Sequence, residues 1–221
     1  MIVLALDTAL EACSVAVGNG DRLLARRYEE CGRAHAERLM PMIEAALGEA
    51  SLDISVVTRI GVTVGPGSFT GLRTGLAAAR GLALALSCPA IGITTCAALA
   101  AGVATGAPLA IAIDARRGEI YLAAYDGEGV ETLSPRALAL AAALPLLSAL
   151  SRTWRVAGSA AAALASTLAA ARLKASVVEN AVWPDAVHML GLVARAVPEE
   201  NPPRPLYLRA VDAKRLRETT P

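Results

Sequence analysis

Two apolar runs that each end in an aspartate constrain the fold of this chain more than any other feature of its sequence. Val3-Leu4-Ala5-Leu6-Asp7 opens the chain, and Ala110-Ile111-Ala112-Ile113-Asp114 repeats the pattern 107 residues later. A short apolar run bounded by polar residues is typical of a strand that is buried on both faces. The repetition predicts two related lobes, and a chance likeness of two short runs is the alternative.

Each run opens a meander, after which helices alternate with strands. In the first half, the patterns predict strands at 2–6, 12–17, 22–28, 56–64 and 90–93, helices at 35–48 and 70–86, and a helix that opens at Thr94. Because Pro41 lies inside the first helix, that helix is either kinked there or regular only beyond it. In the second half, they predict strands at 109–113, 120–125, 154–157 and 176–178, an Ala/Leu segment at 138–150 that Pro145 interrupts, and helices from Ser159 and around 185–197.

This order of elements indicates an α/β protein with the two-lobed actin-like ATPase fold (ASKHA, ribonuclease H-like). We predict an N-terminal lobe at 1–104 and a smaller C-terminal lobe with a basic tail at 105–221.

The composition limits the class of protein and its partners. Of the 221 residues, 55% are hydrophobic, which excludes a disordered chain. Lys and Arg number 21 against 20 Asp and Glu, so the net charge of +1 gives no bulk attraction to a polyanion. The seven aromatic residues are too few for the stacking platforms that bind single-stranded RNA. We expect a nucleic acid to be met locally or through another protein.

The sequence predicts a cytoplasmic protein without a membrane segment. Met1 to Asp7 turns acidic after six residues, unlike a signal or transit peptide. Residues 81–113 carry no charge over 33 positions, which exceeds a membrane-spanning length, but Ser87, Pro89 and Gly92 interrupt this stretch. We interpret it as a buried helix, strand and helix.

The stretch from Gly65 to Gly75 (GPGSFTGLRTG) follows a predicted strand and opens a helix. Glycines permit unusual backbone conformations, and the free amides of a helix N-terminus bind anions, with Thr70 or Ser68 as the cap. A tight strand-to-helix turn is the alternative. Arg73 opposes the helix dipole in the first turn, so we expect it to pair with a carboxylate or a phosphate. The stretch fits neither the Walker A pattern nor the dinucleotide fingerprint. Its candidate site residues are Gly65, Gly67, Ser68, Phe69, Thr70 and Arg73.

Asp7 and Asp114 are the second candidate site. In a two-lobed actin-like fold, they would face each other across the cleft and hold a magnesium–nucleotide through its waters. Alternatively, each aspartate caps its own turn. Neither turn has a glycine that lets a backbone amide approach a phosphate, so any nucleotide is expected to be weakly held.

The sequence argues against a metal site or a catalytic residue of the chain's own. His35 and His188 have no neighbouring ligand at a metal-binding spacing. Ser68 lacks the G-x-S-x-G context of a serine hydrolase. The four cysteines have no CxxC spacing, and we expect them to be small buried hydrophobes.

The helix from His35 to Glu49 carries an apolar stripe of Leu39, Met40, Ile43 and Leu47. Core packing is the default explanation for such a stripe, and a protein interface is the competing one.

Five segments, taken together, resemble one family. They are Ile2 to Thr8, His35-Ala36-Glu37 with Leu39 to Ile43, Gly65 to Arg73, Asp114-Ala115-Arg116-Arg117-Gly118-Glu119-Ile120-Tyr121, and Leu206-Tyr207-Leu208-Arg209. In this order, over nearly the whole chain, they are similar to the TsaB (YeaZ) family, the bacterial accessory subunit in the formation of N6-threonylcarbamoyladenosine (t6A) at position 37 of ANN-reading tRNAs.

The resemblance implies a non-catalytic scaffold that dimerises with a metal-bearing TsaD-type paralogue and works with a TsaE-type ATPase, with tRNA met only through the complex. Thr95 and Leu99 stand where the TsaD pattern has its metal histidines. No cofactor of its own is implied, only weak ATP or ADP with magnesium at the complex interface. The implied junction site includes Asp7, Thr8, Asp114 and Arg116.

On this interpretation, the helices at 35–47 and 70–86 form the partner face, through His35, Glu37, Leu39, Met40, Ile43 and Leu47, and the chain alone homodimerises through the same face. The alternatives are a free-standing actin-like ATPase or small-molecule kinase that uses Asp7 and Asp114, and a metallopeptidase.

Overall fold

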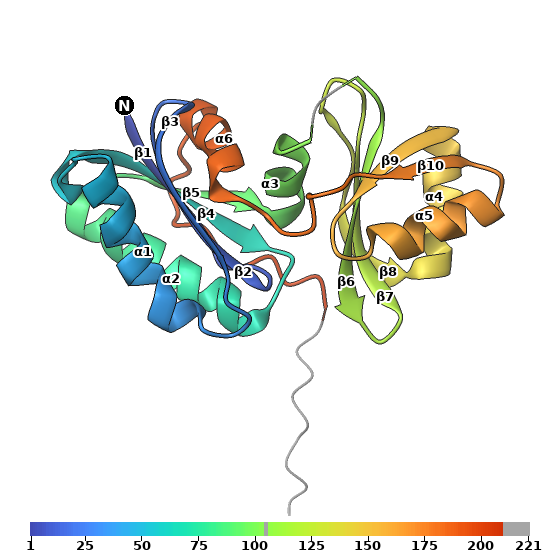
Figure 1. Ribbon diagram of the computed structural model, residues 1–221, viewed down its shortest axis with the longest axis horizontal. Coiled ribbons are helices and arrows are strands. Elements are labelled where there is room, and N and C mark those ends of the chain that lie inside the picture. The colour runs from blue at the N-terminus through green and yellow to red at the C-terminus, as the bar shows by residue number, and fades with distance from the viewer. Residues whose placement is uncertain (104–105, 210–221) are drawn as a thin grey trace, which may run out of the picture.

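The computed structural model describes residues 1–103 and 106–209, which form two lobes that are each built on a five-stranded mixed sheet (Figure 1). In lobe 1 the strand order is β3-β2-β1-β4-β5, with β1 (Ile2–Asp7), β2 (Ala12–Asn19), β3 (Arg22–Glu30), β4 (Val57–Gly65) and β5 (Ala90–Thr94). In lobe 2 the order is β10-β9-β6-β7-β8, with β6 (Leu109–Arg116), β7 (Glu119–Tyr125), β8 (Glu131–Ala139), β9 (Thr153–Ala157) and β10 (Lys174–Val177).

The repeated apolar runs occupy the same place in both lobes. β1 pairs antiparallel with β2 and parallel with β4, and β6 pairs antiparallel with β7 and parallel with β9. The two sheets therefore have one topology, which confirms the predicted two-lobed α/β fold.

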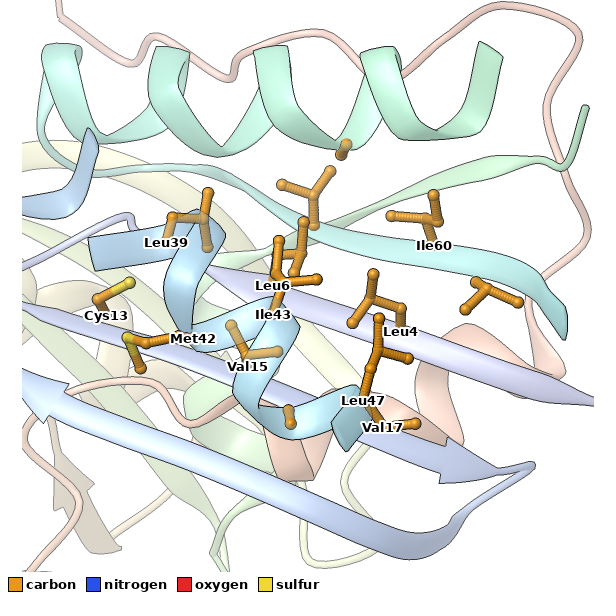
Figure 2. Close-up of a cluster of buried hydrophobic side chains, with 14 of the residues drawn as sticks. Leu4, Leu6, Cys13, Val15, Val17, Leu39, Met42, Ile43, Leu47 and Ile60 are labelled. Atoms are coloured by element: carbon orange, nitrogen blue, oxygen red, sulfur yellow. The ribbon is translucent and has the colours of Figure 1, made fainter. Parts of the chain in front are cut away.

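One face of the lobe 1 sheet is covered by α1 (His35–Glu49) and α2 (Phe69–Leu86), and η1 (Ile54–Val56) leads into β4. Figure 2 shows Leu39, Ile43 and Leu47 of α1 turned toward Leu4 and Leu6 of β1. α1 is helical on both sides of Pro41.

The predicted partner face is wrong for four of its six residues. His35, Leu39, Ile43 and Leu47 are at most 6% exposed, because the apolar stripe of α1 covers the apolar face of its own sheet. Core packing, the default explanation, is therefore correct for this stripe.

In lobe 2, α4 (Ala143–Leu150) and α5 (Ala161–Ala170) cover one face of the sheet, after the short η2 (Leu140–Ala142). The sequence pattern missed β8. This strand lies at the edge of the sheet, where Pro135 can be accommodated without breaking the ladder, and its side chains are half-buried or exposed. Its hydrophobic alternation is correspondingly weak.

The predicted C-terminal lobe at 105–221 is wrong for residues 186–195, and the predicted basic tail lies mainly outside the described residues. After β10 the chain returns to lobe 1, where η3 (Ala186–Met189) and α6 (Leu190–Arg195) pack on the second face of its sheet (Figure 1). A Cβ on Gly61 would lie 2.2 Å from Val193 Cγ2, so a glycine is what lets α6 approach β4 this closely. Local patterns in 185–197 carry no information on which sheet these residues cover.

Helix α3 (Thr95–Ala101) joins the lobes. Its Cys96 and Leu99 pack with Val103 against Leu109 and Ile111 of β6. The uncharged stretch 81–113 is thus the end of α2, β5, α3 and the start of β6. Among the described residues, no helix has the length and hydropathy needed to span a membrane.

Candidate functional site

A cavity of about 760 Å³ lies between the lobes, a volume in the range of small-molecule sites. We call it the cleft. Lobe 1 contributes the β1–β2 turn, the loop before α1 and the start of α2, and lobe 2 contributes the end of β6 and the β9–α5 junction. Its lining residues are Leu10, Glu11, Gly32, Arg33, Gly67, Ser68, Asp114, Ala115, Arg116, Tyr121, Ser159, Val182 and Trp183.

The glycines of the Gly65–Gly75 stretch serve close packing. A Cβ on Gly67 would lie 2.3 Å from the carbonyl oxygen of Ala9, and one on Gly71 would lie 2.1 Å from that of Thr8. Real Cβ atoms do not approach backbone oxygens so closely, so only glycines let α2 begin directly against the β1–β2 turn. The tight-turn alternative accounts for these glycines without any bound phosphate.

Hydrogen bonds lock this contact. Thr8 is buried, and its Oγ1 donates to the carbonyl of Gly71 at 2.7 Å, while the Ser68 amide donates to the carbonyl of Ala9 at the same distance. Ser68 is the cap of α2, since its Oγ accepts from the Gly71 amide at 3.3 Å. Thr70, the other candidate, lies inside the helix.

Asp7 lies beneath the cleft and does not line it. The residue has no exposed surface, and its Oδ1 accepts from Thr63 Oγ1 at 2.7 Å and from the Ala9 amide at 3.2 Å. Its Oδ2 has no hydrogen-bond partner among the residues that the structure describes. Burial raises the pKa of Asp7 from 3.8 to about 7, against the lowering effect of these two hydrogen bonds.

Asp114 lies on the wall of the cleft, with 47% of its side chain exposed. Its Oδ1 accepts from the Arg116 amide at 2.8 Å, so it caps its own turn, and its amide donates to Ser159 Oγ at 3.0 Å. The prediction that Asp7 and Asp114 face each other across the cleft is wrong. Asp7 is fully buried on the side of the sheet where Val3 and Ala5 pack against η3 and α6, whereas Asp114 lies on the wall of the cleft.

This donor set does not fit a magnesium ion held between two carboxylates. Asp114 is engaged in its turn, and Glu11, the other acid on the wall, lies 3.2 Å from Arg116 across the mouth of the cleft. Two arginines, Arg33 and Arg116, and two serine hydroxyls face the same space. The cleft has the size and the cationic groups for a nucleotide, and its two acids, Glu11 and Asp114, are both ion-paired with Arg116.

Arg73 was predicted to pair with a carboxylate or a phosphate, and its partners among the described residues are two aromatic side chains. Its guanidinium lies 3.7 Å from the centre of the Phe69 ring, and its Nε donates to the Tyr207 hydroxyl at 3.1 Å. The Phe69 and Tyr207 rings are stacked with centres 5.5 Å apart. Aromatic faces stabilise a cation, which satisfies Arg73 at this helix N-terminus.

Sequence reasoning missed Arg33, Ser159 and Trp183 as residues of the cleft, because none of them belongs to a motif with a chemical signature. Gly65 does not line the cleft. It is the last residue of β4, and its positive φ of +115° is a conformation that favours glycine. Among the predicted partner residues, Glu37 and Met40 are exposed on the outer side of α1.

Two sheets of identical strand order around a cleft define the actin-like ATPase fold. A protein of that fold and unknown function from Bacteroides thetaiotaomicron matches with a TM-score of 0.50 over 88% of this chain and 96% of that one, at 10% identity. The likeness at this identity concerns the fold alone.

The family follows from closer matches. The family model described as TsaD, tRNA N6-adenosine threonylcarbamoyltransferase, matches residues 28–146. YeaZ from Pseudomonas aeruginosa is 34% identical, with a TM-score of 0.76 over 94% of this chain and 99% of that one. The tRNA threonylcarbamoyladenosine biosynthesis protein TsaB of Escherichia coli (strain K12) is 42% identical over 128 residues, which span 57% of this chain and 55% of the relative. The chain belongs to the TsaB/YeaZ family.

Proposed function

We propose that this chain is a non-catalytic accessory subunit for the formation of t6A at position 37 of ANN-reading tRNAs, and that it acts by pairing with a metal-bearing TsaD-type paralogue. The observation that carries the proposal is the identity of two α3 residues. Thr95 and Leu99, at the positions that the resemblance assigns to metal ligands, are buried, and neither side chain suits a metal of that site. Membership of the TsaB/YeaZ family supports the assignment to tRNA threonylcarbamoyladenosine biosynthesis.

The outer side of α1 and α2 is the proposed contact with the paralogue. Met40 is 50% exposed, Phe69 40% and Leu84 83%, and Gly81 between the latter two has no neighbour within 4 Å of a Cβ. A surface of exposed apolar and small side chains on two neighbouring helices suits a helical partner. The isolated chain is expected to homodimerise through this surface, which would otherwise stay in contact with water.

The remaining components are met through the complex. A net charge of +1 gives the chain little attraction for tRNA by itself, so the proposal leaves tRNA contacts to the assembly with the TsaD-type and TsaE-type proteins. ATP or ADP would lie weakly in the cleft, near Arg33 and Arg116.

A reconstituted tRNA-modification assay, with and without this chain, tests the proposal. Modification that requires the chain supports it, and equal modification in its absence overturns it. For the contact, we expect Met40→Glu with Leu84→Glu to abolish co-purification with the TsaD-type protein. Leu150→Glu is the matched control, because Leu150 is 46% exposed on α4 of lobe 2. Undiminished pairing of the double variant would exclude this surface.

The alternative of a free-standing ATPase or kinase is disfavoured by the same geometry. It requires Asp7 at the nucleotide, and Asp7 has no exposed surface. ATP turnover by the purified chain alone, lost on Asp7→Ala, would restore this alternative.

A further inference from the structure

The last described residues, 206–209, contact both lobes. Figure 1 shows the chain leaving α6, passing along lobe 1 and ending beside β6 of lobe 2. We propose that this segment is a brace that holds the two lobes at a fixed angle and positions the β6–β7 turn at the mouth of the cleft.

Lobe 1 holds the chain leading into the brace through arginines that donate to its backbone. Arg59 donates to the carbonyls of Val193, Ala194 and Ala196, and Arg80 donates to that of Pro203. Arginine donors at the C-terminal carbonyls of α6 also satisfy groups that a helix end leaves free. The path of the segment along lobe 1 is thus set before the brace begins.

The brace itself docks at the start of α2. The Leu206 amide donates to the carbonyl of Val64 at 2.7 Å, and the Leu206 carbonyl oxygen would lie 2.8 Å from a Cβ on Gly65. Tyr207 completes the attachment through its stack on Phe69 and its hydrogen bond from Arg73. The Gly65–Arg73 stretch is therefore the docking site of the brace as well as the start of α2.

Arg209 makes the contact with lobe 2. It donates to the carbonyl of Ala115, and its Nε lies 3.0 Å from Glu119 Oε2, with side-chain exposures of 25% for Arg209 and 38% for Glu119. A carbonyl and a carboxylate bound by one planar guanidinium fix direction as well as distance. The Arg116–Glu11 pair also crosses between the lobes, but it is 75% and 55% exposed and is therefore a weak tie.

The β6–β7 turn that Arg209 contacts contains two residues in an unfavourable backbone conformation. Arg116 and Arg117 have φ of +66° and +57°, a left-handed conformation that is unfavourable for residues other than glycine. The same turn carries Asp114 and Arg116 onto the wall of the cleft. By holding both ends of the turn, at Ala115 and Glu119, Arg209 is a positioning residue for the cleft.

Distance measurement between spin labels tests the brace in the full-length chain. Labels are placed at Asp21→Cys in the β2–β3 turn of lobe 1 and at Ser166→Cys on α5 of lobe 2. The partly exposed Cys31 and Cys88 are replaced by serine, whereas Cys13 and Cys96 are fully buried and are kept. Dilution with unlabelled protein removes distances between molecules. Arg209→Ala is expected to widen the distance distribution roughly two-fold, as for a released collective hinge motion.

Further variants separate the brace from general stability. Tyr207→Ala, which detaches the lobe 1 end, and Glu119→Gln, which weakens the lobe 2 end, are expected to widen the distribution in the same direction. Arg38→Ala is the matched control, because it breaks a two-bond arginine–glutamate pair with Glu29 inside lobe 1. A distribution that is the same for the parent, Arg209→Ala and Glu119→Gln overturns the proposal, as does equal widening by Arg38→Ala.

Discussion

The two lobes share one strand order, yet the aspartate at the end of the first strand is buried in lobe 1 and exposed in lobe 2. In lobe 1, the junction after β4 packs on Ala9, two residues beyond Asp7: the Ser68 amide bonds the Ala9 carbonyl, and Gly67 lies against it. In lobe 2, the junction after β9 packs on Ala112, two residues before Asp114, through the Ala160 amide at 2.9 Å and through Gly158.

The two acids also lie on different sides of their sheets. Asp7 follows Val3 and Ala5, whose side of the sheet is covered by η3 and α6, and it is buried there. Asp114 follows Ala110 and Ala112, whose side is covered by α4 and α5, and it lies on the wall of the cleft. A repeated strand-to-acid pattern therefore indicates common topology without common chemistry. The environment of each acid depends on which elements cover its side of the sheet.

The largest expected effect concerns the charge of Asp7. Its pKa of about 7 in the folded chain lies above the unfolded value of 3.8, so between these values the native state binds the extra proton. The free energy of unfolding therefore falls as the pH rises from 4 to 7, by up to about 4 kcal/mol from this group, and is then flat. Asp7→Asn is expected to remove this fall.

Urea unfolding at several values between pH 4 and pH 8 measures the effect. The matched control is Asp114→Asn, the equivalent acid of lobe 2, which is exposed to water and should leave the pH dependence of the wild type intact. Parallel curves for Asp7→Asn and the wild type would show that Asp7 is not buried as described.

The next effect tests the close packing of α2 on the β1–β2 turn. Gly71→Ala places a Cβ 2.1 Å from the Thr8 carbonyl oxygen, so the helix must shift, at an expected cost of about 3 kcal/mol. Gly81→Ala in the same helix meets nothing within 4 Å and should stabilise the chain by about 0.5–1 kcal/mol.

The comparison of these two variants by urea unfolding separates contact from helix propensity. Opposite signs of the change in the free energy of unfolding are expected. Similar stabilisation by both substitutions would mean that α2 does not press on the β1–β2 turn.

The smallest effect concerns the ion pair across the mouth of the cleft. Glu11→Gln removes the partner of Arg116 at 3.2 Å, and because both side chains are exposed we expect at most about 0.5 kcal/mol of lost stability. The loss should vanish in 1 M salt, where exposed pairs are screened. A larger, salt-independent loss in urea unfolding would mean that the mouth of the cleft is closed more firmly than this geometry implies.

Much of the fold could be predicted from local patterns. The apolar runs at 2–6 and 109–113, the helix from His35 and the strand–helix order after Val56 all lie where the periodicity placed them, to within a few residues. β8 was missed because an edge strand with half-exposed side chains has little alternation. Of the cleft, the sequence singled out Gly67, Ser68, Asp114 and Arg116, since these belong to motifs with recognisable turn or charge chemistry.

Sequence alone determined the class of fold, the family, and the absence of metal-ligating side chains at positions 95 and 99, because each of these depends on residue identity or on periods of two to four residues. Tertiary structure decided that the α1 stripe faces its own sheet, that Asp7 is buried while Asp114 is exposed, and that residues 186–195 return to lobe 1. These outcomes depend on contacts between distant residues, such as Thr63 with Asp7 and Arg59 with Ala196. Burial and pairing across such separations leave no local pattern, because they are set by which surfaces meet after the elements have formed.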